Sequence, residues 1–337
     1  MFDTMPLQEM KTYKGRQEVP DDFDEFWDKQ IQKVNENLPY KIVKRNFGLK
    51  NVWCFDLFFE GTNNGIVHAK CVFPAYCKKA PVVFRFHGYM GQALDWADLL
   101  QYEPMGVGLV AMDVRGQQGQ SVDGEAFYGN TVLGHIVRGA VDGPEHLFYK
   151  DVFLDAYSLI EIVSDFEMVD EDKLYTWGDS QGGALALVSA ALNPRIKKCA
   201  TQYPFLSDFK RILELGPTTL PYEELFRYFK FYDPFHKTEA KLLNTLSYID
   251  VKNFAHRIKC PVLMFTGLED KTCFPSTQFA IYNRILSKKD HILLPEYDHE
   301  PMFYYVSSAV SNWLLGTKFP LEPPDTSSKT FKDEFRR

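Results

Sequence analysis

The 337-residue sequence has no long apolar run, because no stretch of about 18 residues is both apolar and free of charge. Residues 1–17 likewise contain no segment that resembles a signal peptide. The six cysteines include no C-x-x-C pair, and several lie in apolar runs where a free thiol behaves as a small hydrophobic side chain. These absences predict neither a membrane span nor a disulfide framework, and favour a cytoplasmic protein with reduced thiols.

Concentrated positive charge is also missing. The chain has 38 Lys and Arg against 45 Asp and Glu, a net charge of −7, and no long run of either sign. Nucleic acids and anionic membranes both require clustered Lys and Arg, so neither is expected as a partner.

The common metal and nucleotide motifs are absent as well. There is no H-E-x-x-H, no dinucleotide fingerprint and no Walker motif, and His299 followed by Glu300 does not by itself form a ligand set. The run G-Q-Q-G-Q at residues 116–120 lacks the Lys-Ser/Thr ending of a phosphate-binding loop and indicates a turn. No metal and no organic cofactor are therefore expected.

The residues that are present suffice for a large core, since 45% are hydrophobic and 15% aromatic. Helical periodicity is found at residues 23–31, 152–169 and 277–286. A turn at residues 61–65 joins the first two strand-like runs into a hairpin, and the later runs alternate with helices. This order predicts an α/β fold with a mostly parallel sheet, covered on both faces and active at the carboxyl ends of its strands. The expected strands are 52–59, 66–73, 82–86, 107–112, 174–177, 198–202, 262–266 and 292–294.

The interval 203–257 breaks this alternation. It has no convincing strand and is rich in bulky aromatic residues, notably between Phe226 and Phe235. It is predicted to be a helical insertion, which either forms a lid or assembly surface or packs as ordinary crossover helices. The chain is expected to form one domain over residues 1–320 that contains this insertion, followed by a polar tail at 321–337.

The strongest signal for chemistry is the G-x-S-x-G motif at residues 178–182. An apolar strand-like run at 173–177 precedes it and an Ala/Leu-rich helical run at 184–188 follows, which is the context in which the motif has meaning. A serine at such a sharp turn exposes its hydroxyl above the sheet, and the helix that begins there favours a developing negative charge. Ser180 is therefore predicted to be a nucleophile.

A serine nucleophile needs a histidine base and an orienting carboxylate, which follow in the chain order Ser, Asp/Glu, His. Glu269 and Asp270 lie on the loop after the strand at 262–266, and the residues alone do not decide between them. His299 follows the last expected strand, where the base should lie. The remaining histidines occupy positions that favour structural or surface roles: His68, His87, His135, His146, His236, His256 and His291.

Two main-chain N–H groups could form the oxyanion hole. One donor in this arrangement belongs to the residue after the nucleophile, here Gln181. The other comes from the loop after an early strand, where F-H-G-Y at residues 86–89 makes Tyr89 the natural donor.

Taken together, these residues resemble the acetyl xylan esterase and cephalosporin C deacetylase family, carbohydrate esterase family 7. The combination of Arg-Gly-Gln with Ser-Gln-Gly-Gly is far more specific than G-x-S-x-G alone, and the resemblance covers about residues 10–315. The motifs that carry it are D-F-D-E-F-W at 22–27, F-H-G-Y at 86–89, D-V-R-G-Q at 113–117, G-D-S-Q-G-G at 178–183, G-L-E-D at 267–270 and H-E at 299–300.

The resemblance implies an α/β-hydrolase fold with Ser180 as nucleophile, Asp270 as orienting acid and His299 as base. It implies that the N–H groups of Tyr89 and Gln181 bind the oxyanion. The resemblance thus favours Asp270 over Glu269.

The resemblance also implies a function. Members of that family remove acetyl groups from small compounds, including acetylated xylo-oligosaccharides, acetylated sugars and cephalosporin C. They are intracellular hexamers. A homo-oligomer, a small acetylated substrate and no cofactor are therefore expected here. A peptidase or thioesterase on the same fold is the alternative, followed by a hydrolase-fold protein without activity. This chain departs from the family pattern at Asp179, where a small residue is common, and in the spacing of residues 117–120.

Overall fold

The computed structural model describes residues 3–34, 38–125, 135–216, 221–301 and 305–322. The chain divides into two compact units, Met1–His299 and Glu300–Arg337. The smaller unit contains α10 (Val306–Leu315), which ends at Gly316 with a left-handed φ of 73°. The tail predicted from residue 321 onward lies almost wholly outside the described residues, and the predicted domain limits stay a prediction.

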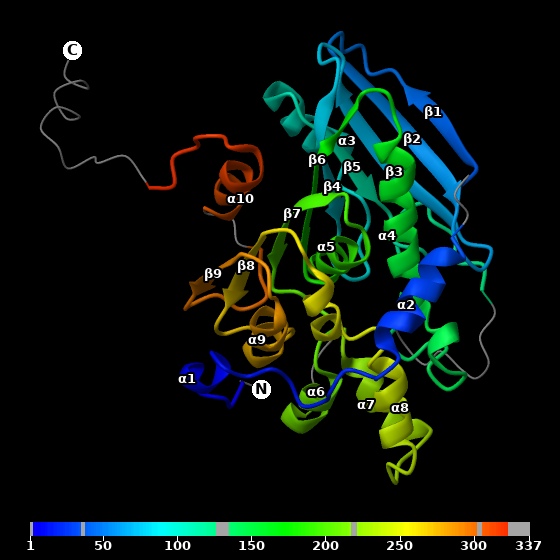
Figure 1. Ribbon diagram of the computed structural model, residues 1–337, viewed down its shortest axis with the longest axis vertical. Helices are drawn as coiled ribbons and strands as arrows, with labels where there is room; N and C mark the ends of the chain where they lie inside the picture. Colours follow the sequence, from blue (N-terminus) through cyan, green and yellow to red (C-terminus); the bar gives the residue numbers. More distant parts are fainter. Residues whose placement is uncertain (1–2, 35–37, 126–134, 217–220, 302–304, 323–337) are drawn as a thin grey trace, which may run out of the picture. The chain divides into compact units, whose positions relative to one another are not determined.

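The strands of the larger unit form one twisted sheet in the spatial order β1-β2-β3-β5-β4-β6-β7-β8-β9 (Figure 1). Neighbours from β1 to β5 pair antiparallel, and those from β5 through β4 to β9 pair parallel. The predicted hairpin and the predicted mostly parallel sheet are both confirmed. The strands are β1 (Tyr40–Arg45), β2 (Val52–Glu60), β3 (Ile66–Pro74), β4 (Ala80–Phe86), β5 (Gly108–Met112), β6 (Val169–Asp179), β7 (Ile196–Gln202), β8 (Val262–Gly267) and β9 (Lys289–Leu294).

One strand was missed by the sequence prediction, and one helix–strand boundary was predicted wrongly. Strand β1 was not predicted, because five of its six residues are exposed and charges interrupt its apolar alternation; pairing with β2 makes it a strand. The helix predicted at 152–169 ends at Ser164, and β6 begins at Val169 instead of Leu174. The first residues of β6 include the exposed Glu171 and Asp172, which hid the start of the strand in the sequence pattern.

Helix α5 lies at the centre of the fold. All twelve of its residues are buried, and it packs on β4, β6 and β7, while α4 packs on α5 and β6 (Figure 1). Apart from Gln181 and Ser189, its sequence consists of Gly, Ala, Leu and Val, which lets a helix lie buried all round. The helices of the larger unit are α1 (Leu7–Met10), α2 (Phe23–Gln32), α3 (Trp96–Leu99), α4 (Phe148–Ser164), α5 (Gln181–Leu192), α6 (Phe209–Leu215), α7 (Glu223–Phe231), α8 (Glu239–Leu246) and α9 (Pro275–Arg284), with short 3₁₀ turns at Leu100–Met105, Pro144–His146, Val251–Asn253 and Ala255–Arg257.

The described part of residues 203–257 contains α6, α7, α8 and two 3₁₀ turns but no strand, as predicted. Its aromatic residues divide between two environments. Phe229 is buried, whereas Phe231, Tyr232 and Phe235 are exposed. The segment therefore contributes to the core and also presents aromatic side chains on its surface.

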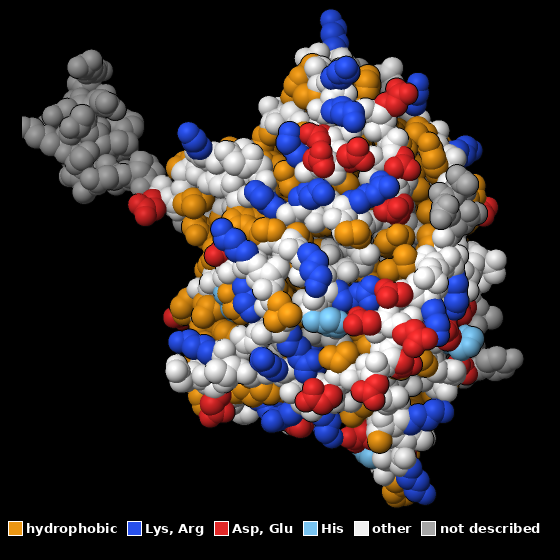
Figure 2. Space-filling view, viewed as in Figure 1, with side chains coloured by type: hydrophobic (Ala, Val, Ile, Leu, Met, Phe, Trp, Pro, Cys, Tyr) orange, Lys and Arg blue, Asp and Glu red, His pale blue; other side chains and the backbone are white. Residues whose placement is uncertain are grey.

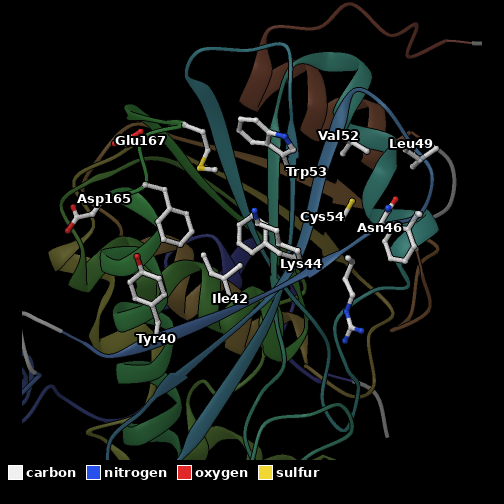
Figure 3. Close-up of a pocket in the computed structure, with 15 residues that line it drawn as sticks. Tyr40, Ile42, Lys44, Asn46, Leu49, Val52, Trp53, Cys54, Asp165 and Glu167 are labelled. Atoms are coloured by element: carbon white, nitrogen blue, oxygen red, sulfur yellow. The ribbon is translucent and has the colours of Figure 1, made fainter.

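Elsewhere on the surface, a groove of about 630 Å³ lies over β1 and β2. Alternate side chains of β1, Tyr40, Ile42 and Lys44, line it together with Trp53 from β2 (Figure 3). It contains none of the predicted catalytic residues.

On the face drawn in Figure 2, Lys and Arg side chains are interspersed with Asp and Glu.

The insertion is tied to the body of the fold by a buried carboxylate. Glu224 of α7 accepts hydrogen bonds from the main-chain N–H groups of His135, Ile136 and Val137, the first at 2.7 Å and the last at 3.4 Å. His135 in turn contacts the hydroxyl of Tyr89, with 3.3 Å between Nδ1 and Oη. Glu224 thus links α7 to the loop that holds a predicted oxyanion donor.

We predict that Glu224 makes the protein less stable as the pH rises. Burial raises the pKa of Glu224 to about 8, against 4.5 for an exposed glutamate. A raised carboxyl pKa means that the folded state holds a proton which the unfolded chain loses. Its contribution is therefore complete below about pH 4.5 and is lost as the pH rises to about 8.

The Glu224→Gln variant keeps a similar shape but cannot titrate. We expect wild type to lose up to about 1.4 kcal/mol of unfolding free energy per pH unit relative to the variant between pH 5 and 8, and little more above that. Denaturant unfolding at pH 5.5, 7 and 8.5 measures the difference. Parallel pH curves for the two proteins would contradict the prediction.

Candidate active site

Ser180 occupies the turn between β6 and α5. Its backbone has φ 53° and ψ −119°, a left-handed conformation that costs a non-glycine residue about 1–3 kcal/mol. Two glycines make the turn possible: a Cβ on Gly178 would lie 2.0 Å from the carbonyl oxygen of Gly182, and one on Gly182 would lie 2.0 Å from that of Phe86. The G-x-S-x-G spacing is therefore required by the close approach of the helix to the sheet.

The predicted nucleophile, base and acid are adjacent in the structure. His299 Nε2 lies 3.0 Å from Ser180 Oγ, and His299 Nδ1 lies 2.9 Å from Asp270 Oδ2. His299 follows β9 and Asp270 follows β8, so both come from loops at the carboxyl edge of the sheet. The three side chains form one hydrogen-bonded line, with distances suited to proton transfer.

Asp270, and not Glu269, is the carboxylate that contacts the histidine. Asp270 is 1% exposed, and its Oδ1 accepts hydrogen bonds from the N–H groups of Thr272 and Cys273, each at 2.8 Å. Burial raises the pKa of Asp270, although His299 and these N–H groups act in the opposite direction. The side chain of Glu269 is exposed and accepts no hydrogen bond within the described residues.

The backbone around His299 is fixed by residues that the sequence did not indicate. Asp298 Oδ1 accepts the N–H groups of both His299 (2.9 Å) and Lys271 (2.8 Å), so it joins the loop of the acid to the loop of the base. The ring of Tyr203 packs against the imidazole of His299 with 4.3 Å between centroids. Burial, followed by the charges of Asp179 and Asp270, raises the pKa of Tyr203, so it stays neutral.

The side facing the predicted oxyanion is built around a pair of glutamines. Gln117 and Gln181 exchange two side-chain hydrogen bonds, of 2.6 and 3.0 Å, and Tyr149 Oη donates to Gln181 Oε1 at 2.8 Å. Gln117 Oε1 also accepts the N–H of Met90 at 2.9 Å, which fixes the loop that carries Tyr89. Gln117 was not predicted as a site residue, although it belongs to the Arg-Gly-Gln element.

The main-chain N–H groups of Tyr89 and Gln181 have no acceptor among the described residues. Both are therefore available for a ligand oxygen, and Gln181 begins a twelve-residue helix whose N-terminal partial charge is positive. Both ring nitrogens of the neighbouring His87 have hydrogen-bond partners. Its Nδ1 contacts the carbonyl of Gly88 at 2.7 Å, and its Nε2 accepts the N–H of Val114 at 3.0 Å. Burial lowers the pKa of His87, in keeping with a neutral, structural histidine.

Within the described ranges, no group of three or more His, Cys, Asp or Glu side chains is arranged so that it could hold a metal ion. Over the same ranges, the helices are all too short or too polar to cross a membrane.

Comparison with known proteins places the chain in a family. The model of the acetyl xylan esterase (AXE1) family matches residues 1–317. The chain is 42% identical to acetyl xylan esterase 1 from Thermoanaerobacterium sp. JW/SL YS485, with a TM-score of 0.89 over 93% of this chain and 98% of that one. It is 33% identical to an acetyl xylan esterase from Paenibacillus sp. R4, with a TM-score of 0.86 over 93% of this chain and all of that one.

A more distant structural comparison agrees on the fold. An alpha/beta hydrolase from Penicillium sp. sh18, 16% identical, superposes with a TM-score of 0.53 over 83% of this chain and 97% of that one. Acetyl esterase Axe7A from Xylanibacter ruminicola is 30% identical over 166 residues, which are 49% of this chain but only 36% of that relative. With an α/β-hydrolase sheet and a family match that spans nearly its whole length, this chain belongs to the acetyl xylan esterase family of carboxylic ester hydrolases.

Proposed function

We propose that this protein is a serine carboxylesterase that removes acetyl groups from small acetylated substrates, such as acetylated xylo-oligosaccharides, acetylated sugars or cephalosporin C. The observation that carries the proposal is the line of hydrogen bonds from Ser180 through His299 to the buried Asp270. Membership of the acetyl xylan esterase family supports acetyl as the acyl group.

The proposed reaction has two halves. His299 Nε2 takes the proton of the Ser180 hydroxyl as Oγ bonds to the acetyl carbonyl carbon, and the N–H groups of Tyr89 and Gln181 bind the oxyanion. When the ester C–O bond breaks, His299 returns the proton to the leaving alcohol and an acetyl-enzyme remains. Water then attacks that acetyl group, with His299 again as base, and acetate is released.

The charge of Asp270 has a specific task in this scheme. It accepts a hydrogen bond from the Nδ1–H of His299, which leaves Nε2 free to receive the serine proton, and it stabilises the imidazolium that forms. No metal or organic cofactor takes part in the proposed cycle.

Acyl-transfer groups do not by themselves select the leaving group, so a peptidase or thioesterase remains the alternative. The assay that separates these activities compares p-nitrophenyl acetate with a peptide anilide and an acyl thioester. We expect turnover of the acetate ester to dominate. A screen for acetate release from acetylated xylo-oligosaccharides, acetylated monosaccharides and cephalosporin C then ranks the substrates.

We predict that Ser180→Ala leaves the fold intact but lowers kcat on p-nitrophenyl acetate by roughly a thousandfold or more, because the nucleophile and base act as a unit. A serine-directed organophosphate should label Ser180 in wild type. Mass spectrometry of the labelled peptide and circular dichroism of the variant serve as controls. Turnover that survives in the alanine variant would remove the serine mechanism.

A second prediction separates the two neighbouring acids. Asp270→Asn should reduce kcat by roughly a thousandfold to ten-thousandfold, because the imidazole loses the partner that fixes its tautomer. Glu269→Gln removes one negative charge from the same loop and should change kcat little. Steady-state kinetics on one ester compares them, and the opposite ranking would assign the acid to Glu269.

A third prediction concerns size. We expect this protein to form a homo-oligomer, a hexamer by family resemblance, whose site admits only short acyl groups. The rate should fall steeply from acetyl to butyryl and octanoyl esters, because extra methylenes meet protein walls. Sedimentation should give a mass above the 39.0 kDa of one chain. Equal rates on acetyl and octanoyl esters from a sedimenting monomer would contradict this expectation.

A further inference from the structure

Asp179, the last residue of β6, precedes the proposed nucleophile and forms an ion pair with Arg85 of β4 through its Oδ1. Arg85 is itself held firmly. Its Nη1 donates to the carbonyl of Phe86 at 2.6 Å, and its guanidinium lies over the ring of Trp177, 4.9 Å from the centroid. The position of the Asp179 carboxylate is therefore set by a fixed cation.

The second carboxylate oxygen of Asp179 remains available. Across the described ranges no donor is hydrogen-bonded to Oδ2, and 27% of the side chain is exposed, against 16% for Arg85. A Cβ placed on Gly88 would lie 3.5 Å from this oxygen and 3.9 Å from Cβ of Ser180. Oδ2 of Asp179 and Cβ of Ser180 thus both lie close to Gly88, on the loop that carries Tyr89.

A cavity of about 280 Å³ lies beside Gly88; Arg85, Gly88, Tyr89, Gln92 and Asp179 are among its lining residues, whereas Ser180 is not. The volume lies just below the range of about 300–1,000 Å³ typical of small-molecule sites, and so suits a single ring better than a chain of rings. Since Tyr89 is a proposed oxyanion donor, the cavity adjoins the place where the ester carbonyl would bind.

An ionised carboxylate oxygen can only accept hydrogen bonds, and those to a charged acceptor are strong. Resting on the function proposed above, we propose that Asp179 is a specificity-determining residue: its Oδ2 accepts a hydrogen bond from a hydroxyl adjacent to the acetate ester. The substrate class is then the monoacetate of a vicinal diol, the arrangement that a partly acetylated sugar ring presents. The small residue that the family resemblance leads one to expect at this position would provide no acceptor.

The experiment uses two esters that differ by one hydroxyl, cyclohexyl acetate and trans-2-hydroxycyclohexyl acetate. Acetyl migration in the second compound regenerates the same molecule, so the probe stays defined. For wild type we expect kcat/KM for the hydroxy ester to exceed that for cyclohexyl acetate by about tenfold or more. Asp179→Ala, which removes the acceptor, should bring this ratio close to one.

Asp179→Asn keeps the shape and a neutral acceptor, so its ratio should fall between those of wild type and the alanine variant. Glu269→Gln is the matched control, because it removes one negative charge from an exposed position on the loop that carries Asp270 and should keep the wild-type ratio. A role of the Asp179–Arg85 pair that is only structural would lower both rates together and leave the ratio unchanged.

A wild-type ratio near one, or an alanine variant with the wild-type ratio, overturns the inference. If the alanine variant does not fold, the wild-type and asparagine ratios decide alone. Failure of the proposed function looks different: wild type would then lack Ser180-dependent turnover of p-nitrophenyl acetate, whereas failure of the inference alone leaves that turnover in place.

Discussion

The close contact between α5 and the sheet is the constraint on which the candidate site depends. Ser180 keeps its left-handed conformation because its main chain is bonded on both sides: its N–H donates to Gln202 O at 3.0 Å, and its carbonyl accepts the N–H groups of Ala184 and Phe205 at 3.0 and 3.1 Å. Three hydrogen bonds of about 1 kcal/mol each are comparable with the strain of about 1–3 kcal/mol. The glycines at 178 and 182 bring these groups within reach, so the chemistry of the turn follows from its packing.

Packing and hydrogen bonding also explain why the Arg-Gly-Gln element at residues 115–117 marks the candidate site. Arg115 is fully buried and forms two hydrogen bonds of 2.6 Å with Asp155 of α4 and one of 2.9 Å with the carbonyl of Thr62. An unpaired buried charge would be costly, so the arginine fixes the start of this loop against two other segments. Gly116 then turns with a φ of 66°, which brings Gln117 to the side chain of Gln181. Arg115 thus anchors the start of the loop, and Gln117 connects the loop to the side chain of Gln181 and to the N–H of Met90.

The sequence sufficed to predict the parallel sheet, the hairpin, Ser180, His299 and an acid at residue 269 or 270, because each depends on a local pattern or on chain order. Strand β1 escaped prediction since its stability comes from its partner and not from its own alternation. Gln117, Asp298 and Tyr203 escaped for a related reason. They act through contacts with residues far away in the chain, and nothing in a glutamine, aspartate or tyrosine of a loop shows that such a contact exists. The choice between Glu269 and Asp270 likewise needed either the family resemblance or the geometry.

Two carboxylates lie near Ser180, and their surroundings separate what each can do. Asp270 is almost fully buried, so its charge acts on the imidazole 2.9 Å away with little screening by water. Asp179 is partly exposed and already paired with Arg85, so its field at the histidine is weakened twice, by solvent and by the neighbouring cation. A carboxylate in that setting contributes little to the strength of the base. Asp179 does retain an acceptor oxygen, Oδ2, in the residue that precedes the nucleophile. A hydrogen-bond acceptor with a defined position is what recognition of a neutral hydroxyl requires.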